Sequence, residues 1–310
     1  MTRVFIDGSA GTTGLRIRSR LAGRSELAVT VLEGEARKDM ERRRAELNSC
    51  DLAVLCLPDE AARESVSLIE NPAVRVVDTS TAHRVAPGWA YGFPELGKER
   101  REAIVSGGRV ASPGCHASGF IALVQPLIEA GILPADALLS CFSLTGYSGG
   151  GKGMIAEYEA AERPESFVSP RIYSLPQSHK HLPEMTGITG LKSAPVFVPT
   201  VADYYCGMLV TVPLFVSQLA PGYGLADVRD CLAAKYSGSV VRYAGSMDTG
   251  GFMDSNSLAG TDAMLVTACG NGERITLHSR FDNLGKGASG AAVQCINLML
   301  GLDECAGLTL

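Results

Sequence analysis

The stretch TRVFIDGSAGTTGLRIRSRLAG, residues 2–23, decides the fold class. Its first six residues are typical of a short apolar strand, and the residues after the glycine-containing turn follow a helical pattern that ends at Gly23. Four further strands are predicted, with polar helical stretches between several of them, at residues 27–33, 51–58, 74–80 and 108–112. Alternation of this kind predicts an α/β, Rossmann-like doubly wound parallel sheet.

The pattern changes from about residue 137. Longer strands separated by turn signals such as GNGE are predicted at residues 137–147, 206–216, 263–270 and 274–283. They favour an α+β domain with a mixed or antiparallel sheet. The closing segment GKGASGAAVQCINLMLGL predicts a helix that packs back on the first domain. We therefore expect one domain over residues 1–117, completed by a helix over 285–310, and a second domain over 118–284.

Composition narrows the function classes. With 310 residues, the chain exceeds the size at which one core usually stops growing, which favours two domains. The net charge of −5 argues against a nucleic-acid partner, and we interpret the basic run 37–46 as a solvated helix face. No stretch reaches ~18 apolar residues, so we expect no membrane partner. Nine cysteines without a C-x-x-C pair predict a cytoplasmic protein with neither a zinc site nor a disulfide framework.

The first turn has the features of a dinucleotide site. Its glycines form G-x-x-G-x-x-G, one residue away from the usual fingerprint, and such a turn lets backbone N–H groups at a helix N-terminus meet a pyrophosphate. The threonines add hydroxyl donors. The candidate cofactor contacts in this turn are Gly8, Ala10, Gly11, Thr12, Thr13 and Gly14.

The choice between NAD and NADP stays open on these residues alone. Glu33 ends the second strand, where an acid can hold the ribose 2′-hydroxyl of NAD. Arg37 and Lys38 follow it, and either cation can pair with the 2′-phosphate of NADP.

One cysteine differs from the other eight. Cys115 lies in SPGCHASG, directly before a helical pattern that ends at Gly131, and a helix N-terminus favours the thiolate. A nucleophile of this kind needs a proton donor or acceptor. His179 and His181, in the polar turn QSHKHLPEM, are distant in sequence, but a cleft between two domains would bring them close.

Several motifs together resemble one enzyme family. They are FIDGSAGTTGLRIRSRL, VRVVDTSTAHRV, SPGCHASG, GYSGGGKGMI, HKHLPEM and FDNLGKGASGAAVQ, and they extend from one end of the chain to the other. The chain resembles N-acetyl-γ-glutamyl-phosphate reductases of the shorter form, which are related to aspartate-semialdehyde dehydrogenases. The resemblance implies NADPH-dependent reduction of an acyl phosphate to an aldehyde in arginine biosynthesis, through a cysteine thioester. The same chemistry on β-aspartyl phosphate is the alternative.

The resemblance also implies roles for residues. Cys115 matches the nucleophile, His179 matches the acid/base, and His181 is its substitute and a substrate contact. Arg84 matches a substrate contact. For Lys152 a phosphate contact and an exposed turn are equal alternatives, and the further expected contacts with NADP(H) are Ser148, Gly149, Asn283 and Arg37. The family motif is often N-P-G-C-Y, whereas this chain has SPGCH, so His116 competes for the acid/base role. The first domain would bind NADP, and the second would carry catalysis and form a homodimer or homotetramer.

Overall fold

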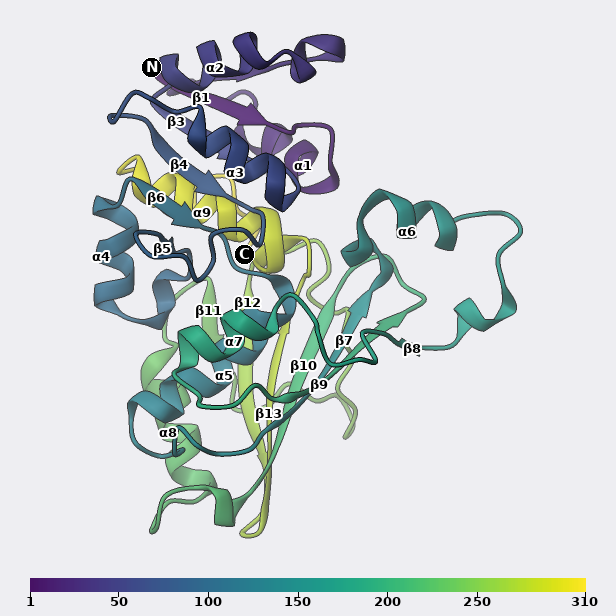
Figure 1. Ribbon diagram of the computed structural model, residues 1–310. Helices are drawn as coiled ribbons and strands as arrows, with labels where there is room; N and C mark the ends of the chain where they lie inside the picture. The colour runs from purple at the N-terminus through teal and green to yellow at the C-terminus, as the bar shows by residue number, and fades with distance from the viewer. The chain divides into compact units, whose positions relative to one another are not determined.

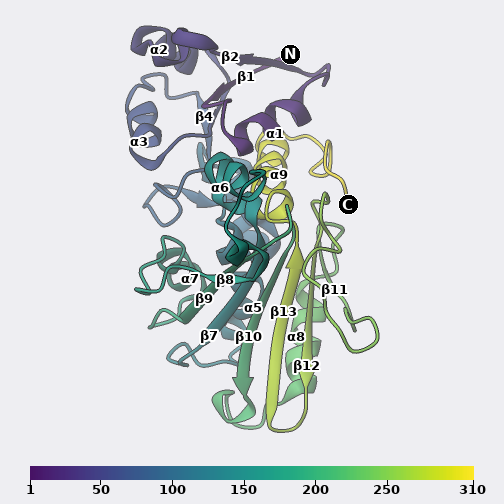
Figure 2. The same cartoon turned by 90° about the vertical axis from the view of Figure 1, so that its right-hand side faces the viewer.

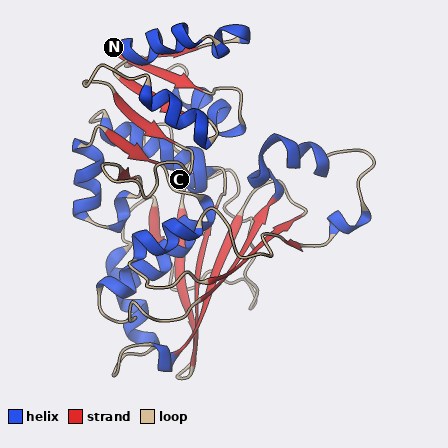
Figure 3. Ribbon diagram, viewed as in Figure 1, coloured by secondary structure: helices blue, strands red, loops and turns tan.

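A computed structural model describes residues 1–310 and separates the chain into two units, each with its own sheet (Figures 1 and 3). Unit 1 contains Met1–Pro113 and Ala288–Leu308, and unit 2 contains Gly114–Gly287 with Thr309–Leu310. The first junction therefore falls four residues before the expected one, because the helix that begins at Cys115 packs on the sheet of unit 2.

Unit 1 is built on a six-stranded, fully parallel sheet with the order β2-β1-β3-β4-β6-β5. Its strands are β1 Thr2–Asp7, β2 Leu27–Val31, β3 Leu52–Leu55, β4 Arg75–Asp78, β5 Ala90–Tyr91 and β6 Arg109–Ala111. Its helices are α1 Thr12–Leu21, α2 Met40–Ser49, α3 Asp59–Ser67, α4 Lys98–Ser106 and α9 Gly290–Met299. The order reverses between β1 and β3, and ligands of open α/β sheets bind at such a point.

Helices cover both faces of this sheet, which explains its continuous apolar strands. Val4 and Ile6 of β1 pack in one core with residues of α1 and α9. Phe5, which points to the opposite face, packs in a second core with residues of α2 and α3. The prediction of a doubly wound parallel sheet is confirmed.

The basic run 37–46 is not wholly solvated, contrary to the interpretation above. Arg43 of α2 is buried, and its guanidinium lies 3.2 Å from Asp7 Oδ2 at the end of β1. It also donates to Glu64 and Ser65 of α3. A buried arginine needs such partners, so this one residue connects β1, α2 and α3 beneath the glycine turn.

Unit 2 is built on a seven-stranded mixed sheet with the order β11-β12-β13-β10-β7-β9-β8. Its strands are β7 Ser140–Gly146, β8 Arg171–Ile172, β9 Val196–Ala202, β10 Met208–Phe215, β11 Val241–Tyr243, β12 Met264–Gly270 and β13 Arg274–Phe281. Its helices are α5 Cys115–Glu129, α6 Gly151–Tyr158, α7 Leu182–Thr189 and α8 Leu225–Lys235. Two pairs, β7 with β9 and β11 with β12, are parallel, and the others are antiparallel.

Helix α5 is the centre of unit 2. Gly119 allows it to lie directly on the sheet, because a Cβ at this position would be 2.4 Å from Val210 Cγ2. Pro126 interrupts the helix chemically, since proline has no N–H to donate to the carbonyl of Ala122. The Tyr236 hydroxyl, from the end of α8, donates to that carbonyl instead at 2.8 Å. The helix continues to Glu129.

The opposite face of this sheet carries exposed apolar side chains. Phe142 of β7 alternates with buried Cys141 and Ser143, so it points away from α5, and half of its surface is exposed (50%). Phe215 at the end of β10 is 62% exposed. Figure 2 views β10, β13 and β12 from this side, with α8 behind them. We call this surface the outer face.

The C-terminal segment differs from its prediction. In place of one helix over 285–310, a π-helical turn at Gly285–Ser289 leads into α9, which ends at Met299. The remaining residues form turns, beginning at Gly301 with a φ of +68°, a left-handed conformation that glycine adopts readily. Strands β5, β8, β9 and β11 were not predicted.

Candidate active site

Cys115 is the first residue of α5, as the sequence predicts. Gly114 is the N-cap residue and brings no side chain to the first turn, which contains no acidic residue. Anions are stabilised at such helix N-termini by unpaired N–H groups and by the helix dipole. The thiol is half-buried, so Cys115 has the position that a nucleophile requires.

The histidine turn reaches the Cys115 segment within unit 2 alone. The ring centroid of His116 lies 5.5 Å from that of His179 and 5.6 Å from that of His181. His179 and His181 are themselves 4.6 Å apart. All three histidines belong to unit 2, so they meet within one domain and not across the cleft between domains that we expected from the sequence.

His116 is committed to two hydrogen bonds. Its Nδ1 lies 2.6 Å from Ser143 Oγ, and its Nε2 lies 2.6 Å from the Tyr173 hydroxyl. Burial lowers its pKa to about 3, and the positive charges of His179 and Lys180 add to this effect. The ring is therefore neutral near pH 7 and poorly suited to carry protons.

His179 has a defined tautomer. Its Nδ1 accepts the backbone N–H of His181 at 3.1 Å, so the neutral ring carries its proton on Nε2. The turn ends where α7 begins, with Pro183 in the first turn of the helix, where proline is well tolerated. Nε2 of His179 is thus the nitrogen with a proton to donate.

Three residues near Cys115 were missed by the sequence analysis. Tyr173, just after β8, has its pKa raised by burial and by the charge of a Cys115 thiolate, and its hydroxyl lies 2.6 Å from Nε2 of the neighbouring His116. Glu184 of α7 accepts the Gly114 N–H at 3.1 Å. Gly287 is in close contact with Cys115, because a Cβ there would lie 3.0 Å from the Cys115 Cβ.

The predicted cofactor residues of unit 2 form a second group. The Asn283 amide donates to Ser148 Oγ at 3.0 Å and accepts the Gly207 N–H at 2.9 Å. Gly149 is adjacent, with room for a Cβ at 3.6 Å from the Asn283 amide nitrogen. Lys152 lies in the exposed first turn of α6, which projects from the sheet in Figure 1.

The glycine turn of unit 1 fits a dinucleotide. Gly8 has a φ of +89°, and a Cβ there would be 2.3 Å from the Cys56 carbonyl oxygen. A Cβ at Gly14 would be 2.6 Å from the Gly8 oxygen, whereas Gly11 is exposed and has no such close neighbour. Helix α1 begins directly after Gly11 without a side-chain cap or an acidic first turn. A pyrophosphate can therefore approach these N–H groups.

The acid that favours NAD is already paired. Glu33 follows β2, and its carboxylate accepts Arg18 Nη1 of α1 at 2.9 Å. Arg37 is exposed in the 3-10 helix Gly34–Lys38, and Lys38 pairs with Glu35 at 3.2 Å. Three cationic side chains thus lie near the end of β2: Arg18 on α1, and Arg37 and Lys38 in the segment that follows the strand.

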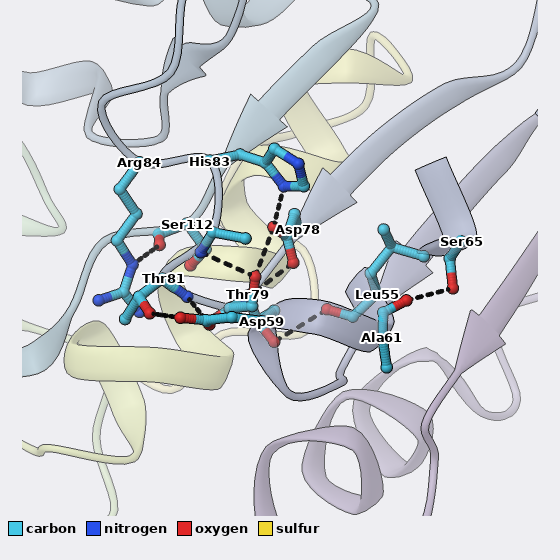
Figure 4. A network of polar contacts seen from close by, with 12 residues as sticks. Leu55, Asp59, Ala61, Ser65, Asp78, Thr79, Thr81, His83, Arg84 and Ser112 are labelled. Atoms are coloured by element: carbon cyan, nitrogen blue, oxygen red, sulfur yellow. Dashed lines mark hydrogen bonds and ion pairs between the residues drawn. The ribbon is translucent and has the colours of Figure 1, made fainter. Parts of the chain in front are cut away.

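Arg84 lies in a polar network after β4 (Figure 4). Asp78 accepts the Ser80 hydroxyl at 2.7 Å and lies 2.6 Å from His83 Nδ1, and His83 stacks on Trp89 with centroids 4.1 Å apart. Arg84 donates to the carbonyls of Ser112 and Thr79 at 3.0 and 3.3 Å. The guanidinium is thereby held in place.

Comparison with known proteins agrees with this arrangement. Residues 3–104 match the semialdehyde dehydrogenase NAD binding domain, and residues 115–283 match the semialdehyde dehydrogenase dimerisation domain. The chain is 45% identical over 306 residues to an N-acetyl-gamma-glutamyl-phosphate reductase of Brucella ovis, covering 96% of this chain and 99% of that protein. A reductase of the same name from Trichormus variabilis is 43% identical, with 99% of both chains covered.

A solved structure shares the fold. Aspartate semialdehyde dehydrogenase II of Vibrio cholerae superposes with a TM-score of 0.73 over 97% of this chain and 98% of that one, at 16% identity. No helix of the present chain has the length and apolar character needed to cross a membrane.

The parallel sheet with its glycine turn, together with the mixed-sheet domain, defines an oxidoreductase of the semialdehyde dehydrogenase type that binds a nicotinamide cofactor. The identity over nearly the full length then distinguishes among such enzymes. The chain belongs to the N-acetyl-γ-glutamyl-phosphate reductase family.

Proposed function

We propose that this protein reduces N-acetyl-γ-glutamyl phosphate to N-acetylglutamate semialdehyde with NADPH, releasing phosphate, as a step of arginine biosynthesis in the cytoplasm. The observation that carries the proposal is the position of Cys115 at the start of α5, next to His116, whose ring lies 5.5 Å from the His179 ring and 5.6 Å from the His181 ring. The names of relatives at 43–45% identity support the substrate. The aspartate enzyme at 16% identity supports the fold alone, so we put forward no second substrate.

The first half of the reaction forms a thioester on Cys115. The sulfur attacks the acyl carbon, and N–H groups at the start of α5 stabilise the oxyanion. The C–O bond to phosphate then breaks, and phosphate leaves with the bonding electrons and takes up a proton. Arg84 and Lys152 are our proposed contacts for the anionic groups of the substrate, with His181 as a further contact.

The second half releases the aldehyde. When bound, the nicotinamide cofactor supplies a hydride to the thioester carbon. His179 donates its Nε2 proton to the resulting alkoxide oxygen and recovers it as the C–S bond breaks, which returns Cys115 as thiolate. His116 has no part in proton transfer in this scheme, because both of its nitrogens are bonded and its pKa is low.

We propose cofactor contacts within each unit. The glycine turn would hold the pyrophosphate. Gly8 and Gly14 pack closely against protein backbone and so shape the turn, whereas the open position beside Gly11 leaves room for the ligand. Arg37 would meet the 2′-phosphate, and Arg18 favours NADPH further because it neutralises Glu33. From unit 2, the group of Ser148, Gly149 and Asn283 would line the cofactor site.

We also propose that the outer face of unit 2 joins subunits in a homodimer or homotetramer. Phe142 and Phe215 are exposed there, and exposed apolar patches of this kind often mark interfaces. The matched domain is described as a dimerisation domain. Replacing Phe142 by Asp should lower the molar mass measured by light scattering, and an unchanged mass would place the interface elsewhere.

The decisive test runs the reaction backwards. Formation of NADPH is followed with N-acetylglutamate semialdehyde or aspartate semialdehyde, each with and without inorganic phosphate. We expect turnover only with the acetylated aldehyde and phosphate. Cys115→Ala should abolish turnover, and mass spectrometry of the wild-type enzyme should find an acyl group on Cys115. Phosphate-independent oxidation, or turnover by Cys115→Ala, would contradict the proposal.

A further inference from the structure

One buried carboxylate near the nucleophile takes no part in the chemical steps above. Glu184 lies in the first turn of α7, and only 2% of its surface is exposed. Glutamate is almost never fully buried without a partner, because leaving water is costly for a charged group. The position of this side chain therefore needs a physical reason.

Its partner is the residue before the nucleophile. Glu184 Oε2 accepts the backbone N–H of Gly114 at 3.1 Å, across 70 positions of sequence. Gly114 is the N-cap residue of α5, and Cys115 follows it. Glu184 itself follows His181 by three residues. This hydrogen bond thus joins the segment that carries the sulfur to the segment that carries the imidazoles.

Neither segment has a side-chain cap at its own helix start. Gly114 has no side chain to cap α5, and the side chain of His181 makes no capping hydrogen bond in α7. The two helices pack side by side in unit 2, as Figure 1 shows. The hydrogen bond joins the two helix starts and is buried, so it is well placed to set the distance between the helix ends.

We propose that Glu184 is a positioning residue, which holds the start of α5 against the histidine turn so that Cys115 and His179 keep their mutual geometry. The inference rests on the proposed thioester mechanism. The positioning role requires a hydrogen-bond acceptor that reaches from α7 to the Gly114 N–H, and it does not require the negative charge. This requirement predicts a higher kcat for Glu184→Gln than for Glu184→Asp. A purely electrostatic role would predict the opposite order.

Three variants test this requirement. Glu184→Gln keeps an acceptor oxygen at the same reach without the charge, Glu184→Asp keeps the charge but shortens the reach, and Glu184→Leu removes both. We expect kcat to fall by about 10- to 100-fold in the Asp and Leu variants, with KM for the acyl phosphate within about twofold, because misplacement by about 1 Å costs up to 10²-fold. The Gln variant should stay within about threefold of wild type.

The matched control is Thr189→Val. Thr189 lies on the same helix, and its buried hydroxyl bonds the Met185 carbonyl at 2.6 Å, so the variant perturbs α7 without touching the Gly114 contact. It should retain wild-type kcat even where its melting temperature falls. All variants are compared at a temperature at which circular dichroism shows each of them folded.

A second measurement separates this inference from the proposed function. Thioester formation on Cys115 is followed in a single turnover by release of inorganic phosphate. If the wild-type enzyme forms no thioester, the proposed function fails and the inference fails with it. If wild type forms it and Glu184→Leu forms it equally fast with wild-type kcat, only the inference is overturned. A Gln variant as impaired as Leu would also overturn it, because charge would then be the requirement.

Discussion

Substitution of Gly287 by alanine tests how tightly the nucleophile is held. Gly287 lies in the π-helical turn before α9, and an ideal Cβ there would be 3.0 Å from both the Cys115 Cβ and the Asp282 carbonyl oxygen. It would also lie 3.3 Å from Phe281 Cε2. Carbon atoms in contact prefer about 3.5–4.0 Å. The added methyl group therefore requires Cys115 or the turn to move by a few tenths of an ångström.

The expected loss follows from this displacement. Because an error of about 1 Å in an active site costs up to 10²-fold, a shift of a few tenths of an ångström predicts a lower kcat by up to about 10-fold. A tenfold loss corresponds to about 1.4 kcal/mol of activation free energy. The measurements are steady-state kcat and KM together with the rate of Cys115 alkylation by iodoacetamide.

The control for this prediction is Gly272→Ala. Gly272 lies in the turn between β12 and β13, and a Cβ there meets no atom within 4 Å, so activity should be unchanged. If Gly287→Ala is folded and retains kcat within about twofold of wild type, the contact with Cys115 is accommodated without consequence and the reasoning fails.

Three other perturbations have expected outcomes. The folded pKa of His116, about 3, lies below the value near 6.5 of an unfolded chain, so the unfolded state binds the proton first. The free energy of unfolding should therefore fall as pH drops from 6.5 to 3, and His116→Gln should flatten this fall in urea titrations; equal slopes would contradict it. Tyr236→Phe should lower the free energy of unfolding by about 1–3 kcal/mol, because the Ala122 carbonyl loses its donor, and a smaller change in thermal or urea unfolding would mean that water replaces the hydroxyl. Arg37→Glu should weaken NADPH binding by about 1–3 kcal/mol more than NADH binding, as measured by cofactor fluorescence, and equal losses would place Arg37 away from the 2′-phosphate.

The local parts of the fold were predictable from the sequence. The first strand was predicted at residues 2–7 and is observed at Thr2–Asp7, because an apolar run between polar residues and a glycine turn has few other conformations. Cys115 was predicted at a helix N-terminus for the same local reason, since Pro and Gly precede it and an apolar helical pattern follows.

The parts that depend on distant partners were not predictable. Strand β9 contains Pro199, which argues against a strand, yet its neighbours β7 and β8 supply the pairing that the local sequence does not reveal. Arg43 has the sequence context of a solvated helix, and only its distant partners Asp7, Glu64 and Ser65 explain its burial. Glu184 stood within the quoted motif HKHLPEM, but no periodicity relates it to a backbone N–H 70 residues earlier.

The place of α9 in unit 1 has a consequence for biosynthesis. Val293 and Ile296 of this helix pack in the same core as Val4 and Ile6 of the first strand. A ribosome adds about 5–20 residues per second, so the roughly 170 residues of Gly114–Gly287 separate the two halves of unit 1 by roughly 10–30 s. During that interval α1 covers the face that carries Val4 and Ile6, but the core lacks the side chains of α9. The core of unit 1 is therefore completed only after the whole of Gly114–Gly287 has been synthesised, so the two segments of one unit meet across a complete second unit.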